Sequence, residues 1–182
     1  MKVQVYSSTI RRKEMDAVLS CMVEEKTGPG EINLRLVQSI KEFFGVSGAC
    51  ALRSPALALK YALKALGIEK KSKIIISALA PDWHYSALED LGYIPVILDV
   101  SPSNSLVEIS KIEEEIAKGS VAILYHETCG LLPNMEQLLE IGVPVIEDIS
   151  QSCLSSISEK KAGTFGVYSI LGLEEKDLLT AG

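Results

Sequence analysis

Two segments near the start of the chain repeat apolar residues at helical spacing. Residues 11–25 and 31–44 each place apolar side chains at intervals of three and four, which predicts two amphipathic helices. A Thr-Gly-Pro-Gly turn at 27–30 separates them, and residues 1–10 have an extended character.

From residue 47 onward, short apolar runs alternate with helical patterns. The expected strands are residues 49–52, 73–76, 93–100, 121–125, 143–147 and 167–171. The expected helices are residues 54–67, 82–91, 109–117 and 135–141. This alternation predicts an α/β fold, with a mostly parallel central sheet between two layers of helices.

One strand end carries candidate chemistry. The apolar run 143–146 ends in Glu147 and Asp148, and Gln151 follows three residues after the aspartate. Ligands of such sheets bind at the carboxyl ends of the strands. An aspartate there can hold the ring nitrogen of a cofactor such as pyridoxal phosphate (PLP). For this motif alone, an ordinary polar strand end is the simpler interpretation.

A helix start offers a second candidate. Ser54 can cap the helix that follows, and Pro55 suits its first position. The free N–H groups at such a helix start can bind a phosphate. A helix that is merely well capped would give the same pattern.

Composition narrows the class of protein. The chain has 182 residues, of which 47% are hydrophobic, and its net charge of −6 argues weakly against a nucleic-acid partner. No leader and no long apolar run is evident, so we expect a cytoplasmic protein without a membrane partner. The four cysteines are widely spaced, which favours free thiols over disulfides or a metal site.

Taken in order, these segments resemble the N-terminal half of the DegT/StrS-type sugar aminotransferases, which are PLP enzymes of fold type I. The resemblance includes the Ser-Pro-Ala-Leu-Ala-Leu run from Ser54 and the Gly-x-x-Pro-Val-x-x-Asp strand from Gly92. It continues through Glu147-Asp148-x-x-Gln151 and through the Gly-x-x-Gly-x-x-Ser segment that ends at Ser169. The order and spacing of these motifs carry the assignment.

The resemblance implies an architecture and an activity. Residues 1–46 would be an N-terminal segment with two helices, and residues 47–182 a large domain without the family's C-terminal domain. The activity would be transfer of an amino group from a small-molecule donor, often glutamate, to a nucleotide-linked keto-sugar. Family active sites form between two subunits, so a homodimer is expected.

The resemblance also assigns roles to residues. Asp148 would pair with the pyridine nitrogen of PLP, and Gln151 would contact the ring. Ser169 would bind the phosphate together with Ser54 and Ala56.

Several positions depart from the family pattern. Pro55 and Ala56 replace residues that supply a backbone N–H and a hydroxyl, which weakens the expected phosphate site. An ungapped count places Glu174 where the family has its cofactor-binding lysine, whereas a two-residue insertion places Lys176 there. Both alignments stay open, and a surface lysine is the alternative reading of Lys176.

The aromatic residue that stacks on the ring is displaced as well. An ungapped count places Pro81 there, and Trp83 or His84 would serve after a local shift. The family has a histidine near His126, but one count puts Glu127 in its place. The second hypothesis is therefore a family relative that has lost PLP and catalysis and acts as a binding or interaction module.

Overall fold

The computed structural model describes residues 10–181, and these fall into two compact units. One unit holds the residues up to Leu52 together with those from Leu173 on, and the other comprises Arg53–Gly172. Among the described residues, no helix combines the length and the apolar character needed to cross a membrane.

The first unit contains the two helices expected near the start of the chain. They are α1 (Arg12–Val23) and α2 (Glu31–Phe44), and α2 ends at Gly45 with a left-handed backbone (φ 69°). Residues 49–52 form no strand, so that prediction was wrong. Small residues dominate this run and all four side chains are exposed, so pairing them would bury little apolar surface. The extended character predicted for residues 1–10 falls almost wholly outside the described residues.

The second unit is built on a five-stranded parallel sheet. Its strands are β1 (Lys73–Ser77), β2 (Ile94–Leu98), β3 (Ser120–His126), β4 (Val145–Asp148) and β7 (Tyr168–Ile170). They lie side by side in the order β2-β1-β3-β4-β7. In a parallel sheet all carboxyl ends meet at one edge, so the residues after β1, β3 and β4 become neighbours.

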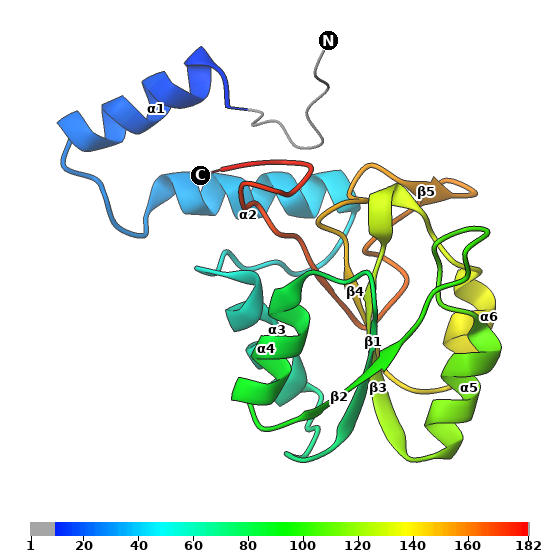
Figure 1. Cartoon of the computed structure of the whole chain (residues 1–182). Helices are drawn as coiled ribbons and strands as arrows, with labels where there is room; N and C mark the ends of the chain where they lie inside the picture. The colour runs from blue at the N-terminus through cyan, green and yellow to red at the C-terminus, as the bar shows by residue number, and fades with distance from the viewer. Residues whose placement is uncertain (1–9, 182) are drawn as a thin grey trace, which may run out of the picture. The chain divides into compact units, whose positions relative to one another are not determined.

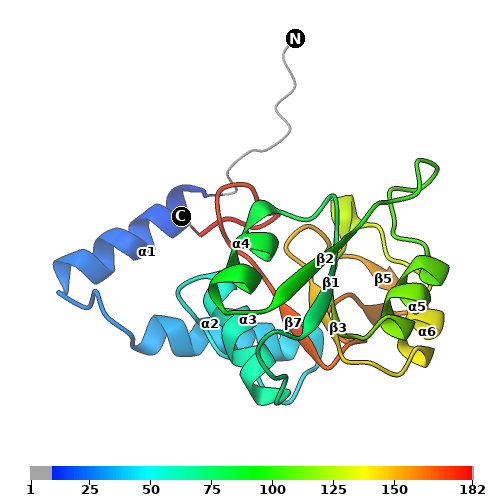
Figure 2. The same ribbon diagram turned by 60° about the horizontal axis from the view of Figure 1, so that its bottom comes forward.

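Helices cover both faces of this sheet, as Figures 1 and 2 show. They are α3 (Pro55–Ala65) and α4 (Asp82–Asp90) on one face, and α5 (Ile109–Ala117) and α6 (Met135–Glu140) on the other. A 3-10 turn, η1 (Thr128–Gly130), follows β3. The expected α/β sandwich with a parallel central sheet is therefore confirmed.

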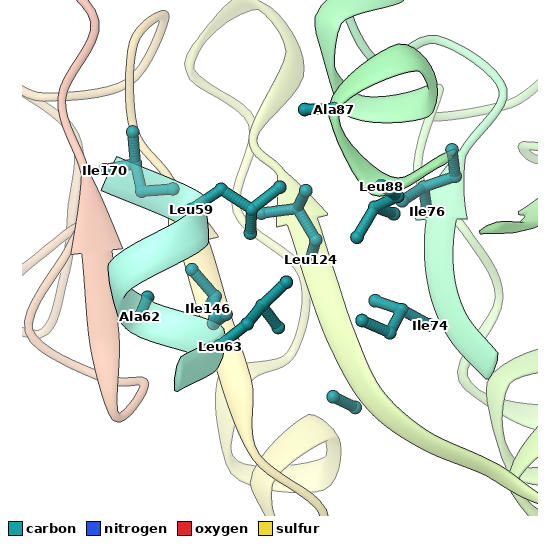
Figure 3. Packing of buried hydrophobic residues seen from close by; sticks show 11 residues of the cluster. Leu59, Ala62, Leu63, Ile74, Ile76, Ala87, Leu88, Leu124, Ile146 and Ile170 are labelled. Atoms are coloured by element: carbon teal, nitrogen blue, oxygen red, sulfur yellow. The ribbon is translucent and has the colours of Figure 1, made fainter. Parts of the chain in front are cut away.

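Each helical layer closes its own apolar core. Leu59 and Leu63 of α3 and Leu88 of α4 are fully buried against Leu124 and Ile146 of the sheet (Figure 3). On the other face, Ile112 of α5 and Leu138 of α6 pack with side chains of β1, β3 and β4. Because the central strands are buried on both faces, they read as continuous apolar runs in the sequence.

A two-stranded hairpin follows β4 and precedes β7 along the chain. It pairs β5 (Ser156–Ile157) with β6 (Lys160–Lys161). Ser158 and Glu159 form its tip, and both have positive φ angles of 47° and 70°, as a tight hairpin turn requires.

Candidate active site

Asp148 is the centre of a buried polar cluster at the carboxyl edge of the sheet. It is the last residue of β4 and stands opposite His126, the last residue of β3. Both side chains are buried, and His126 Nδ1 lies 2.8 Å from Asp148 Oδ2. The register of two strands therefore holds an imidazole against a carboxylate.

His84 reaches the same carboxylate oxygen from the first turn of α4. Its Nε2 lies 2.7 Å from Asp148 Oδ2, and its side chain is fully buried. The half-buried Trp83 ring meets the His84 ring edge to face, with centroids 4.2 Å apart. Of the two residues expected to stack on a cofactor ring, His84 thus binds Asp148 and Trp83 packs beside it.

Ser150 holds the other oxygen of Asp148. Its backbone N and its Oγ lie 3.1 Å and 2.5 Å from Asp148 Oδ1. The same Oγ accepts a hydrogen bond of 2.9 Å from the N–H of Gly172, just after β7. The carboxylate therefore receives two donors on each oxygen, all from this chain.

This arrangement fixes the charge of the cluster. Burial alone would raise the pKa of Asp148, but the hydrogen bonds from His126 and His84 outweigh it and hold that pKa well below its ordinary value. Burial lowers the pKa of His84, more than its bond to Asp148 raises it. His84 is therefore a neutral donor, and its buried Nδ1 has no hydrogen-bond partner within residues 10–181.

The preceding residue, Glu147, lies on the opposite face of β4 because strand side chains alternate. Its carboxylate accepts backbone N–H bonds of 2.8 Å from Gly163, 2.8 Å from Phe165 and 2.6 Å from Gly166. These bonds fasten the segment before β7 to the end of β4. Glu147 is therefore a structural anchor, while Asp148 faces the α3–α4 side.

Glu127, directly after β3, is a second buried acid. It accepts a hydrogen bond from Ser152 Oγ. Burial, aided by the nearby Glu147 and Asp148 carboxylates, raises the pKa of Glu127 to about 9 against that bond. At neutral pH this side chain carries a proton.

The expected cofactor residues near the helix start and after β4 are also placed. Ser54 caps α3, and its Oγ accepts a bond of 3.2 Å from the N–H of Leu57. Pro55 follows, so Ala56 is the first residue of this turn with a backbone N–H. Gln151 Oε1 accepts a bond of 3.0 Å from the N–H of Cys129 in η1, which fixes one end of that side chain.

Ser169 is a candidate that β7 turns away from this cluster. It is opposite Glu147 in the register of β7 and β4, so it points to the face away from Asp148. Lys176 and Glu174 are both exposed and belong to the first unit.

Sequence reasoning missed that His126 and Ser150 bind Asp148. The available signal was position, since His126 ends the strand beside β4 and Ser150 lies two residues after the aspartate. Polar residues at neighbouring carboxyl ends are expected to meet.

The cluster also contains the atoms of a possible metal site. Ligand atoms of His84, His126 and Asp148 all lie within 4.8 Å of one another, and two imidazoles with a carboxylate suit divalent transition metals. The nitrogen–oxygen separations of 2.7 and 2.8 Å, however, are those of hydrogen bonds already made.

Comparison with known proteins decides the family. The model of the DegT/DnrJ/EryC1/StrS aminotransferase family matches residues 8–182. The chain belongs to this family.

Individual family relatives agree with that assignment. GDP-perosamine synthase of Caulobacter vibrioides is 25% identical over 186 aligned residues, which cover all of this chain and 50% of the relative. The L-glutamine:2-deoxy-scyllo-inosose aminotransferase of Micromonospora echinospora is 23% identical and covers 85% of this chain and 38% of its own length.

Solved structures show the same fold. The E. coli GDP-4-keto-6-deoxy-D-mannose-3-dehydratase with bound hydrated PLP superposes with a TM-score of 0.81, at 23% identity, over 91% of this chain and 45% of its own. The aminotransferase of Psychrobacter cryohalolentis gives 0.84, at 21% identity, over 97% and 47%. This chain therefore spans about half the length, or less, of these relatives and solved structures.

Proposed function

We propose that this chain is the cofactor-binding part of a PLP-dependent aminotransferase that acts on a nucleotide-linked keto-sugar. The observation that carries the proposal is Asp148, a buried carboxylate held ionised at the carboxyl end of a central strand. Membership of the DegT/DnrJ/EryC1/StrS family supports the same reading.

The chemistry of the cluster fits PLP. An ionised carboxylate in a water-excluded site is the partner that keeps a pyridine nitrogen protonated. His126 holds that carboxylate from the neighbouring strand, and Ser150 holds it from the loop that follows β4. PLP, when bound, supplies an electron-withdrawing ring that stabilises negative charge on the carbon next to the transferred amine.

The remaining roles follow from position. The Ser54 hydroxyl and the Ala56 N–H at the start of α3 are the groups we propose for the phosphate. The N–H of Leu57 is already bonded to Ser54, so one backbone N–H before it is left for the phosphate. This phosphate site is therefore weaker than one at the start of a helix without proline. Gln151 is proposed to contact the ring, whereas Ser169 is left out because it faces away from Asp148.

Lys176 is the amine that we propose to bond covalently to the cofactor and then to carry the proton between substrate and ring. Its support is the resemblance alone. Glu174 is the competing position, but a carboxylate cannot form that bond.

The substrate class rests on the relatives. Their names describe a GDP-sugar synthase and aminotransferases that use L-glutamine. We propose an amino donor of this kind and a keto-sugar linked to a nucleotide.

We also propose that the protein is a homodimer that works in the cytoplasm. Four apolar side chains on one stripe of α1 are between 56% and 61% exposed: Met15, Val18, Leu19 and Met22. Such a stripe favours association with another surface. The four cysteines are all free, which suits a reducing compartment.

The test is a visible absorption spectrum of the purified protein with added PLP, followed by borohydride reduction and peptide mapping. The proposal predicts a new band in the visible absorption spectrum and a label on Lys176. Lys176→Ala should abolish the band, and the matched variant Glu174→Ala should keep it. The absence of both the band and the label would contradict the proposal. It would favour the second hypothesis, a binding or interaction module.

A further inference from the structure

The chain contains two histidines, and both bind the same oxygen of Asp148. Ser150 supplies two further hydrogen bonds to the other oxygen. A carboxylate offers about four lone-pair sites, so its accepting capacity is used up within the chain. An incoming N–H donor must therefore displace a donor that is already present.

Three of these four hydrogen bonds are fixed by local structure. His126 is held because β3 and β4 are paired in register up to His126 and Asp148. Ser150 is two residues from Asp148, and its hydroxyl is also bound by the N–H of Gly172. Removing either would disturb the ends of three sheet strands, β3, β4 and β7.

His84 is attached differently. It comes from the first turn of α4, 64 residues from Asp148 in sequence, and no side chain among the described residues caps the start of that helix. No strand pairing holds it against Asp148.

His84 would also gain a hydrogen bond if it moved away from Asp148. Its Nδ1 is buried, and no described residue bonds to it, which carries a desolvation cost. A His84 side chain that turned toward water would recover that bond. Since burial lowers its pKa, it leaves as a neutral ring and no charge has to move.

We infer that His84 is an internal cap on Asp148, whose Nε2–H holds the hydrogen-bond position on Oδ2 that the ring nitrogen of PLP takes when the cofactor binds. Binding exchanges one N–H···O bond for another, while His126 and Ser150 stay in place. The inference rests on the proposed function, because it assumes that PLP pairs with Asp148.

The cap lowers the apparent affinity for PLP. Only the fraction of molecules with His84 turned away can bind, and the measured dissociation constant rises by the reciprocal of that fraction. The cofactor-free protein, in turn, avoids an unpaired buried carboxylate. Loading with PLP is therefore coupled to a movement of one side chain.

The test compares the PLP dissociation constant of the wild type with that of His84→Ala, measured by absorbance titration. We expect the variant to bind PLP about tenfold more tightly, or better, because no exchange is needed. The matched control is Ser86→Ala, an exposed position on the same helix, which should leave the affinity unchanged. Equal affinities in the wild type and in His84→Ala would overturn the cap.

A measurement on the wild type guards against a variant that folds poorly. With two histidines in the chain, the imidazole nitrogen NMR spectrum contains two sets of signals. Titration with PLP should move the His84 nitrogens to the values of a solvated ring and leave His126 bound to Asp148. PLP binding that leaves the His84 signals in place, or that releases His126 instead, would overturn the inference.

The outcomes separate this inference from the proposed function. If both proteins bind PLP equally well, the function stands and the cap fails. If neither the wild type nor His84→Ala binds PLP, the proposed function fails and the cap fails with it.

Discussion

His126 Nδ1 lies 2.8 Å from Asp148 Oδ2, and the two residues are partners in the register of β3 and β4. The backbone pairing of the two strands therefore sets the position of the imidazole. Both side chains are buried, so neither can replace its partner with water.

Replacing His126 with alanine should therefore lower the free energy of unfolding by about 3 kcal/mol, because the variant leaves a buried carboxylate with one donor fewer. Urea denaturation at neutral pH measures this loss. The control Val121→Ala, at an exposed position on the same strand, should cost less than about 1 kcal/mol. Similar losses for both variants would contradict the role of His126.

The effect of His126 should also depend on pH. The pKa of Asp148 is lowered in the folded chain, so its stabilising contribution is present above the ordinary value of 3.8 and is lost as the pH falls below it. The stability difference between the wild type and His126→Ala should shrink over that acidic range. A difference that stays constant down to low pH would show that the histidine acts by packing alone.

Gly166 should not tolerate a side chain. A Cβ atom at this position would lie 2.5 Å from the backbone oxygen of Val145 and 3.3 Å from Glu147 Oε1. Gly166→Ala is expected to cost about 2 kcal/mol or more, since the contact is with backbone that pairs in the sheet. Thermal or urea unfolding measures it.

Gly48→Ala is the matched control for Gly166. Among the residues that the structure describes, nothing lies within 4 Å of a Cβ built on Gly48, and its φ angle is not positive. This variant should be neutral or slightly stabilising, because alanine restricts the unfolded chain. Equal losses at both glycines would refute the close approach of Gly166 to β4.

Glu127 should make the folded chain less stable as the pH rises. Its pKa is about 9 in the folded chain against an ordinary value of 4.5, so the folded state keeps a proton that the unfolded state releases between these values. Stability relative to Glu127→Gln should then fall by up to about 1.4 kcal/mol per pH unit over that window. Urea unfolding between about pH 5 and about pH 9 measures the trend.

The exposed carboxylate Glu113 on α5 provides the control. Glu113→Gln makes the same substitution at the surface and should give no comparable slope. A wild type and a Glu127→Gln variant with parallel pH profiles would show that Glu127 is ionised in the folded chain.

Sequence periodicity was sufficient for most of the elements in the second unit. The helix predicted at residues 109–117 matches α5, because its apolar and charged residues repeat at helical spacing and tertiary contacts do not override them. Residues 49–52 failed because a short apolar run becomes a strand only where a neighbouring strand can pair with it.

The site was harder to predict for two physical reasons. The contact between His84 and Asp148 joins residues 64 positions apart, and only the packing of α4 on the sheet brings them together. The side of the sheet that Ser169 faces depends on strand register, and a shift of one residue would reverse it. Motifs indicated that Asp148 mattered, but they could not reveal its partners.

The central claim is that Asp148 binds the ring of PLP, and a PLP titration of the wild type beside Asp148→Asn and Asp99→Asn tests it most directly. Asp99 is an exposed aspartate just after β2, so its variant removes the same charge from the same edge of the sheet. We predict saturable binding by the wild type and by Asp99→Asn, and binding weakened about tenfold or more by Asp148→Asn, because an amide cannot stabilise the protonated ring. Equal affinity of all three proteins for PLP would contradict the claim.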